Sequence, residues 1–351
     1  MKAGDENLNK CSGFTIIELL TVMGIIAILI GLLVPALNLV KDYTKELEQK
    51  AQFHSIDAAL GMFSAEDRYG RYPESNDNMD LLDPTKDNQY DIPLGVPYCG
   101  ANKLAEAIVG LDFLGFHPNS DFRSNNTFSH PEPDEPLGMY HEAPTYHADT
   151  NYEPDNPLYV ESAEENVKAR WGPFVELENA NAFMVTDIYD ADAIEGPGIG
   201  DFDPDRANLV LCDVFDKKRH AGKKTGMPIL YYKARTKFTQ QDYRPDMQGK
   251  TIHNDIYYYM DNYNLLALGS AETPGDWHPL ANGLPGDGGD ISAGAPDYTS
   301  EDDWRDFENM ILNPQIATIK RPYRAGSYIL MSAGKDGLYG TPDDIFNFDK
   351  E

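Results

Sequence analysis

One uninterrupted apolar run dominates the hydrophobic pattern near the N-terminus. Phe14–Val40 is 27 residues long, and Glu18 is its only charged residue. A helix rises about 1.5 Å per residue, so this run spans roughly 40 Å and covers a hydrocarbon core of about 30 Å. No later run in the sequence approaches that length. We therefore predict a single-pass membrane protein whose short polar segment 1–13, with Lys2 and Lys10, stays on the cytoplasmic side.

The helical pattern continues beyond the apolar run. Mostly apolar residues recur at spacings of three and four, first at Leu37, Val40, Thr44, Leu47 and Ala51, and then at Phe53, Ile56, Leu60 and Phe63. No proline interrupts residues 36–72, and Gly70 provides a stop before Tyr72-Pro73. We expect one helix of about 55 residues, roughly 80 Å long. Its membrane part is 14–40, and 41–70 is its exposed amphipathic part.

The rest of the chain carries shorter signals. Residues 71–173 are predicted to be an irregular insertion with one helical piece at Leu104–Leu114. Residues 174–351 hold the strand candidates, and Ile256–Met260 could be either a further strand or an aromatic loop cluster. The strand candidates are Phe174–Tyr189, Asn208–Val214, Pro228–Ala234 and Ser327–Met331. An antiparallel sheet laid over the exposed half of the long helix gives an α+β fold.

Charge and motif content exclude several functions. The chain has 29 Lys and Arg against 58 Asp and Glu, a net charge of −29 that disfavours nucleic-acid binding. It contains no G-x-S-x-G, G-x-x-x-x-G-K or H-E-x-x-H motif, so we do not expect an enzyme. Gly196–Gly200 is interpreted as a turn, and the histidines His130, His141 and His147 as part of a solvated acidic tract rather than a metal site.

A short motif at the start of the apolar run is more specific. Ser12-Gly13-Phe14-Thr15-Ile16-Ile17-Glu18-Leu19-Leu20 resembles the processing signature of type IV prepilins and type II secretion pseudopilins. The resemblance implies a 13-residue leader. A prepilin peptidase would cut between Gly13 and Phe14 and methylate the new amine of Phe14, using S-adenosylmethionine as cosubstrate. Pro35 stands where many such subunits also carry proline.

Two simpler explanations of the apolar run account for less. A secretory signal has an apolar region of about 7 to 15 residues and a small-x-small cleavage site, whereas this run is longer and continues into Lys41. A plain signal anchor leaves Glu18 unexplained, since a charge within lipid costs about 2.5 to 3.5 kcal/mol and usually marks a function. If subunits stack, the carboxylate of Glu18 can meet the free amine of Phe14 of a neighbour, and assembly then neutralises both charges.

Two further segments resemble the major pseudopilin of type II secretion. Asp67–Pro73 is similar to the helix exit of that subunit, a G-x-Y-P turn. The loop from Ser332 to Ile345 resembles its calcium loop, in which S-x-G-x-D-G precedes an acidic pair. Carboxylates among glycines suit the hard oxygen ligands of calcium. The resemblance implies side-chain ligands Asp336, Asp343 and Asp344 and backbone carbonyls near Leu330 and Ser332, and an acidic turn without metal is the alternative.

Cysteine content leaves two alternatives. Cleavage after Gly13 would remove Cys11 and leave Cys99 and Cys212. These two could form one disulfide in an oxidising compartment, or they could be two free buried thiols.

The resemblance implies a pilin-like fold and a structural role. The chain is expected to polymerise into a type II secretion pseudopilus that helps to export folded proteins. Other pseudopilins and an inner-membrane assembly platform would be its partners, and its C-terminal part would lie in the periplasm or outside the cell. One alternative is a type IV pilus subunit for adhesion or motility. Another is a pilin-anchored carbohydrate-binding module, which would require Trp171, Trp277 and Trp304 to line one groove.

Overall fold

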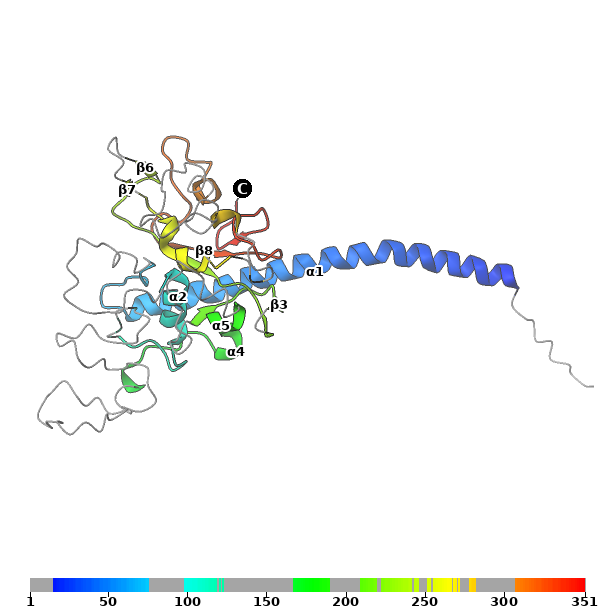
Figure 1. Ribbon diagram of the computed structural model, residues 1–351, viewed down its shortest axis with the longest axis horizontal. Coiled ribbons are helices and arrows are strands. Elements are labelled where there is room, and N and C mark those ends of the chain that lie inside the picture. Colours follow the sequence, from blue (N-terminus) through cyan, green and yellow to red (C-terminus); the bar gives the residue numbers. More distant parts are fainter. Residues whose placement is uncertain are drawn as a thin grey trace, which may run out of the picture. The chain divides into compact units, whose positions relative to one another are not determined.

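The computed structural model consists of one long helix and a body of short strands and helices (Figure 1). It describes residues 15–75, 98–118, 120, 122, 167–189, 209–219, 222–241, 243–245, 251–253, 255–266, 268–269, 271, 278–281 and 307–350. The chain divides into two units, Met1–Leu47 and Glu48–Glu351. Each unit is described by itself.

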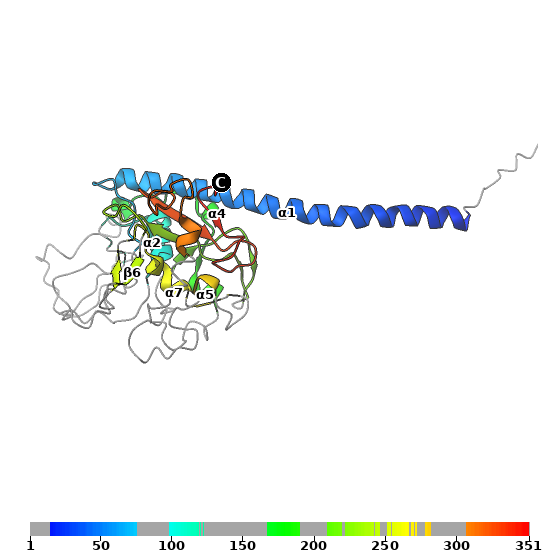
Figure 2. The same ribbon diagram turned by 90° about the horizontal axis from the view of Figure 1, so that it is seen from above.

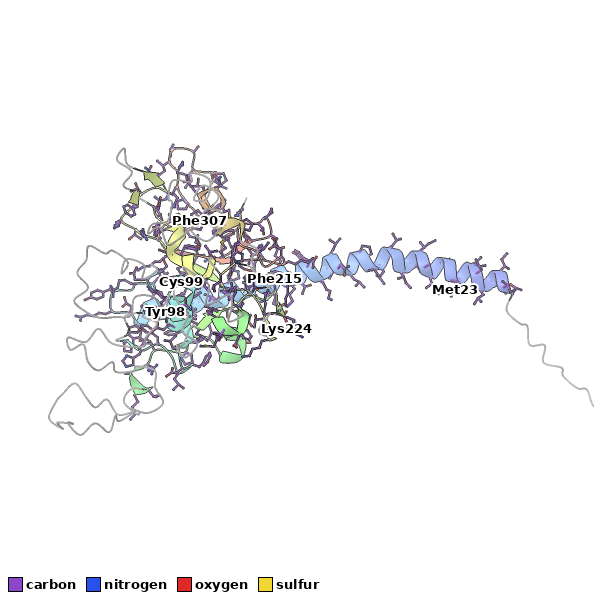
Figure 3. The ribbon with its side chains drawn as sticks, viewed as in Figure 1. Met23, Tyr98, Cys99, Phe215, Lys224 and Phe307 are labelled. Carbon is purple, nitrogen blue, oxygen red and sulfur yellow. The ribbon has the colours of Figure 1, made fainter. Side chains whose placement is uncertain are left out.

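The first unit contains the membrane-type part of helix α1, which runs from Ile16 to Glu66 with Pro35 inside it. Its large apolar side chains are exposed along the whole segment, as at Ile16 and Val40, and Met23 projects from the ribbon in Figure 3. Within the described part of the chain, α1 is the one helix that is long and apolar enough to cross a membrane. The predicted spanning helix is therefore present and continuous.

Within the second unit, the body of short strands and helices packs along one side of residues 48–66 of α1 (Figure 2). The predicted stripe of Phe53, Ile56, Leu60 and Phe63 is buried there, as the 3.6-residue period requires. Polar side chains of α1 also reach the body. Gln52 donates from Nε2 to the carbonyl of Cys212 (2.8 Å). Gln49 accepts the amide of Val214 through Oε1 (3.0 Å), so the contact between helix and body is both apolar and hydrogen-bonded.

Helix α2 (Gly100–Val109) lies within this body and is buried along its whole length. The sequence predicts a helical piece at Leu104–Leu114, and the real helix begins and ends earlier. It ends at Gly110, which has a φ of +75° and where a Cβ would lie 2.2 Å from the carbonyl of Gly115. It begins at Gly100, where a Cβ would lie 2.2 Å from the carbonyl of Tyr231. Glycine is required at both ends because the backbone passes so close to its neighbours.

The described strands form small antiparallel sheets, which confirms the α+β class. The central sheet has the order β5-β8-β9, with Leu230 opposite Met331 and Ser332 opposite Ile345. Three two-stranded sheets pair β1 with β2, β3 with β4 and β6 with β7. The strands are β1 (Ala182–Met184), β2 (Leu209–Leu211), β3 (Lys217–Lys218), β4 (Lys224–Thr225), β5 (Leu230–Lys233), β6 (Tyr243–Pro245), β7 (Thr251–His253), β8 (Tyr328–Ser332) and β9 (Ile345–Phe346).

The central strands are buried on both faces. Along β8, Tyr328 and Leu330 face the cluster that contains α1 and α2, whereas Ile329 and Met331 face a second cluster on the other side. Because successive side chains of a strand point to opposite faces, a strand covered on both sides reads as a continuous apolar run. This explains the predicted runs at Asn208–Val214, Pro228–Ala234 and Ser327–Met331, each of which overlaps an observed strand.

One predicted strand is wrong over most of its length. In Phe174–Tyr189 the structure contains the short helix α4 (Leu177–Ala180), then β1, then α5 (Val185–Ile188). Asn181 ends α4 in the left-handed conformation with φ 49°. Its Nδ2 donates to the carbonyls of Cys212 (2.8 Å) and Asp213 (2.7 Å), so a long-range contact holds the turn.

The segment Ile256–Met260 is an aromatic loop cluster, which was the second of the two predicted alternatives. It is not a strand, and Tyr259 begins a 3-10 helix, η2 (Tyr259–Asn262), which is followed by α7 (Tyr263–Leu266). Ile256 and Tyr257 are buried in the second cluster. That cluster is completed by the 3-10 helix η3 (Pro279–Ala281) and by the helical residues 307–311.

Candidate functional site

The N-terminus of α1 holds the predicted assembly residue. Glu18 accepts two hydrogen bonds on Oε2, from the backbone amide of Thr15 (2.9 Å) and from its hydroxyl (2.7 Å). In return, the amide of Glu18 donates to the hydroxyl oxygen of Thr15 (3.3 Å). This reciprocal pattern is a capping box, which satisfies donors that the first helical turn leaves unpaired. The carboxylate is therefore satisfied within its own chain before it meets any neighbour.

Thr15 is the residue that the sequence reasoning missed. The signal was present, because Thr-x-x-Glu directly before an apolar run is the spacing of a capping box. Gly13 and Phe14, where the motif implies cleavage, lie outside the described residues. Cleavage and methylation there stay predictions.

Pro35 and the small residues of α1 lie on an open surface. The helix continues through Pro35 although proline removes the donor to the carbonyl of Gly31. A Cβ built at Gly24 or Gly31 would meet no atom within 4 Å. These positions leave room for the close approach of another helix.

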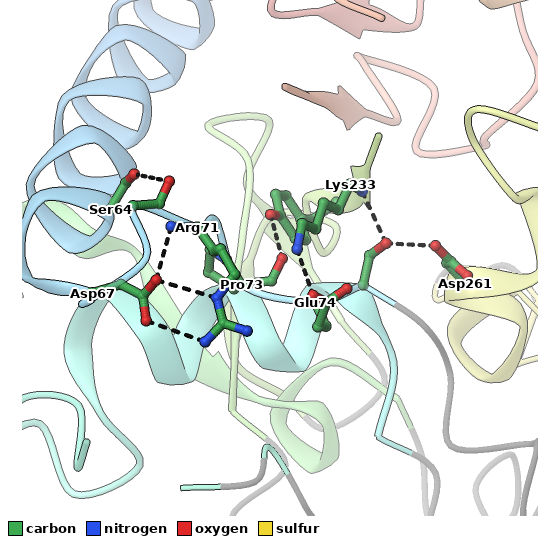
Figure 4. A network of polar contacts seen from close by, with 10 residues as sticks. Ser64, Asp67, Arg71, Pro73, Glu74, Lys233 and Asp261 are labelled. Atoms are coloured by element: carbon green, nitrogen blue, oxygen red, sulfur yellow. Dashed lines mark hydrogen bonds and ion pairs between the residues drawn. The ribbon is translucent and has the colours of Figure 1, made fainter. Parts of the chain in front are cut away.

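The exit of α1 is tied down by local polar contacts (Figure 4). Asp67 Oδ2 accepts the amides of Tyr69 (3.1 Å) and Arg71 (2.9 Å). Ser64 donates from its hydroxyl to the carbonyl of Gly70 (2.9 Å), and Gly70 has a φ of +64°. The helix therefore ends at Glu66 and not at Gly70 as predicted, because Asp67 captures the amides that follow it.

The chain after the exit is fastened to the central sheet. The hydroxyl of Tyr231 donates to the carbonyl of Pro73 (2.7 Å), and Lys233 pairs with Glu74 (2.5 Å). Ser75 receives the amide of Lys233 on its oxygen (2.9 Å) and donates to buried Asp261. Figure 4 shows these contacts running from the helix exit to Asp261. The G-x-Y-P segment thus serves to lock the end of α1 onto β5.

The predicted calcium loop follows β8, and its carboxylates accept hydrogen bonds from backbone amides of the loop itself. Asp344 Oδ2 accepts the amides of Gly340 (2.8 Å) and Thr341 (2.9 Å). Asp343 Oδ2 accepts the amide of Asp336 (3.0 Å), and Asp336 Oδ1 accepts the amide of Leu338 (2.8 Å). A Cβ at Gly334 would lie 2.3 Å from the carbonyl of Asp343, so the motif glycine is required where the two ends of the loop cross.

The carboxylates of this loop lie close together, and their pKa values are shifted from the ordinary value. Burial, reinforced by the charges of Asp343 and Asp336, raises the pKa of Asp344 to about 8. Burial also raises the pKa of Asp336. Although burial opposes it, hydrogen bonds from the Thr341 hydroxyl and the Asp336 amide hold the pKa of Asp343 below its ordinary value. One cation is close, because Lys217 Nζ donates to the carbonyl of Asp336 (3.2 Å).

The oxygen atoms of the loop are of the type that a hard cation prefers, but their side chains are not arranged as a set of metal ligands. Asp344 Oδ1 is buried and has no hydrogen-bond partner, as an oxygen reserved for a metal would be. Across the described residues, however, no three His, Cys, Asp or Glu side chains come together as metal ligands. The carbonyl of Leu330 accepts the amide of Asn347 (3.3 Å), and the hydroxyl of Ser332 donates to Asp213 (2.8 Å). Calcium coordination stays a prediction.

Cys99 and Cys212 are buried thiols that are not joined by a disulfide. Cys99 precedes α2 (Figure 3), and its thiol donates to Asn102 Oδ1 (3.1 Å). Burial raises the pKa of the Cys212 thiol well above its ordinary value, so Cys212 is protonated and unreactive at neutral pH. The structure therefore contains the second of the two alternatives that the sequence left open.

Only one of the three tryptophans considered for a binding groove is described. Trp171 packs with Phe63 (5.9 Å between ring centroids) and Phe116 (5.6 Å) in an aromatic cluster at the end of α1. Trp277, Trp304 and the histidine-rich tract with His130, His141 and His147 lie outside the described residues. Trp171 thus joins the insertion to the helix.

Comparison with known proteins agrees with the N-terminal motif. Residues 8–34 match the family model described as the prokaryotic N-terminal methylation motif. The chain is similar to prepilin peptidase-dependent protein A of Clostridium perfringens, with 28% identity over 117 residues that cover 32% of this chain and 76% of the relative. No solved structure matches the chain. The methylation motif, the exposed apolar helix behind it and the α+β body together support a prepilin-type protein with a pilin-like fold.

Proposed function

We propose that this chain is the subunit of a type II secretion pseudopilus, a filament that helps to move folded proteins outward. The observation that carries the proposal is the N-terminus of α1, where Glu18 is the only charge in the apolar run Phe14–Val40 and is held in a capping box by Thr15. The G-x-Y-P exit and the C-terminal loop, which resemble those of the major pseudopilin, favour secretion over other pilus functions.

Assembly through Glu18 follows from the energetics of charge in lipid. Cleavage after Gly13 would leave the amine of Phe14 in or beside the bilayer, and an unpaired ammonium there is as unfavourable as an unpaired carboxylate. When subunits stack with an axial offset, Glu18 of one subunit can pair with the amine of the next. The apolar surface from Ile16 to Val40 then packs against other helices instead of lipid.

We also propose that the C-terminal loop binds one calcium ion through Asp336, Asp343 and Asp344. The unpartnered buried Oδ1 of Asp344 supports this, because an unsatisfied buried oxygen is unfavourable unless a donor or a cation meets it. A bound cation would supply a positive charge that holds together the loop between β8 and β9. The ion would be structural, and the filament would need no catalysis by this subunit.

Processing and secretion are tested in the same host. Intact mass of the subunit from peptidase-positive cells should correspond to a chain that begins at methylated Phe14, and a mass that retains residues 1–13 would refute processing. Deletion of the gene should trap folded secreted proteins in the periplasm while surface motility continues. A full-length copy should restore secretion, and a Glu18→Ala copy should not.

A type IV pilus is the alternative function. It shares the N-terminal motif, so Glu18 and the capping box do not separate the two. Loss of motility or adhesion with intact secretion after gene deletion would favour this alternative.

A further inference from the structure

A groove in the second unit is not explained by the pilin-like N-terminus. It has a volume of about 530 Å³, within the range of ligand and peptide sites. Its walls come from the segment 309–323, orange in Figure 1, and from Lys350 near the C-terminus. Its apolar lining includes Met310, Leu312, Ile316 and Ile319.

The wall of the groove is a built loop. Its ends are joined where Leu312 pairs with Pro322, and the amide of Asn313 donates to the carbonyl of Arg321 (2.9 Å). A separate segment supports it, because the amide of Gln241 donates to the carbonyl of Lys320 (2.7 Å). The groove is therefore held by backbone hydrogen bonds at its base, and its shape does not depend on a ligand.

The charge of the groove is opposite to that of the chain. Lys320, Arg321 and Lys350 line it, and none of the described lining residues carries a carboxylate. Arg321 is positioned by a hydrogen bond from Nη1 to the carbonyl of Thr239 (3.1 Å), and the Lys350 ammonium lies 4.2 Å from the ring centroid of Phe346. Neither of these two cations forms an ion pair within the described part of the chain. Lys320 pairs with Glu308 (2.5 Å), and the charge of Asp344 acts on Lys350 from beyond ion-pair distance, so among the described residues two lining cations stay outside ion pairs.

The groove also has an unsatisfied polar group beside it. The hydroxyl of Tyr323, a lining residue, is buried and makes no hydrogen bond. The Tyr323 ring stacks on Phe348 with centroids 4.4 Å apart, which fixes its direction. A groove with aliphatic walls, fixed cations and a free hydroxyl is complementary to an acidic peptide segment that also carries apolar side chains.

We propose that this groove receives an acidic segment of a second copy of this chain, a contact that rests on the proposed filament function. A net charge of −29 makes identical subunits repel one another, and a cationic groove provides local attraction. Two such grooves cannot face each other because both are positive. Because the groove and the acidic segment are different surfaces, a head-to-tail arrangement satisfies the contact, and head-to-tail contacts that do not close into rings generate open helical filaments.

Cross-linking in filament-forming cells tests the contact. Ile319, which is 40% exposed at the groove, is replaced by the photoreactive residue p-benzoylphenylalanine in the full-length chain. Irradiation should give a covalent dimer of this chain, and peptide mass spectrometry should place the attachment in a segment rich in Asp and Glu. The same replacement at exposed Lys218 on β3, which does not line the groove, should give less of this dimer.

Charge-reversal variants test how much the groove cations contribute to the dimer yield. In the cross-linking background, the double variant Arg321→Glu, Lys350→Glu should lower the dimer yield about tenfold, because two attractions become repulsions. The matched pair Lys218→Glu, Lys237→Glu makes the same change in net charge outside the groove and should leave the yield unchanged. Arg321→Lys with Lys350→Arg should retain the dimer. Equal thermal midpoints for all variants exclude unfolding as the cause.

The outcomes separate this contact from the filament function. Filaments without the Ile319 dimer would overturn the groove contact and leave the proposed function standing. An adduct with a different protein would overturn the second copy as the occupant, and equal losses in both double variants would show that only net charge matters. Cells that form neither filaments nor the dimer would contradict both proposals.

Discussion

Replacing Glu18 with alanine tests the charge pairing on which assembly depends. In the free subunit, Glu18 is satisfied by Thr15 through contacts of 2.9 and 2.7 Å, so the mutation removes a capping interaction of about 1 kcal/mol. The mutation also removes a charged side chain from lipid. Because placing such a charge there costs about 2.5 to 3.5 kcal/mol, membrane insertion of the variant should not be impaired. In the filament, the amine of the neighbour loses its partner, at about 3 to 5 kcal/mol. Assembly should therefore weaken by about a hundredfold or more.

The capping box predicts an effect of opposite sign at Thr15. Thr15→Val keeps the side-chain shape and removes the hydroxyl that stabilises the Glu18 carboxylate in the free subunit. A hydrogen bond to a charged group contributes about 1.5 to 3 kcal/mol. Losing it raises the free energy of the unassembled state, so the threshold concentration for assembly should fall by about ten- to a hundredfold. Thr15→Ser keeps the hydroxyl and is the control.

Both variants are measured with the same assays. Intact mass reports processing, membrane fractionation reports insertion, and sheared-filament yield as a function of expression level gives the threshold concentration. Glu18→Ala that polymerises at the wild-type threshold would refute the pairing argument. Thr15→Val that weakens assembly as strongly as Glu18→Ala would show that the hydroxyl acts in the filament and not in the free subunit.

The remaining predictions concern the body. Calcium should raise the melting temperature of the full chain in detergent and magnesium should not, and Asp344→Asn should abolish the effect while exposed Asp349→Asn keeps it; equal midpoints with calcium and chelator would exclude the site. Leu60→Ala should lower the free energy of unfolding in urea by about 2 to 5 kcal/mol because Leu60 is fully buried, whereas Gly61→Ala, whose Cβ meets open space, should raise it by up to about 1 kcal/mol. Burial lowers the pKa of His278 to about 3, so the unfolded chain alone binds a proton as pH falls below about 6.5. Stability should therefore fall by about 2 kcal/mol between pH 7 and pH 5, and His278→Gln should remove most of this slope; an unchanged slope would assign it to other groups.

Local patterns in the sequence determined the helices and strands that have one kind of environment along their whole length, such as lipid or the protein core. The membrane-type part of α1 follows from the 27-residue apolar run, because a single segment satisfies its own backbone in lipid only as a helix. The stripe from Phe53 to Phe63 follows from the 3.6-residue period, and burial of the central strands on both faces follows from their continuous apolar runs. Glu18 could also be singled out from the sequence, since a lone charge in such a run requires a partner.

Contacts between distant residues decided the rest. Phe174–Tyr189 has the composition of a strand, but the bonds from Asn181 to the carbonyls of Cys212 and Asp213 turn it into two short helices around β1. The start of α2 depends on a backbone approach between Gly100 and Tyr231. The cationic groove joins residues 309–323 to Lys350, and no local pattern brings them together. The period of apolar residues in the sequence indicates which face of one helix or strand is buried. These features depend instead on which elements pack against each other, and only the tertiary structure specifies that packing.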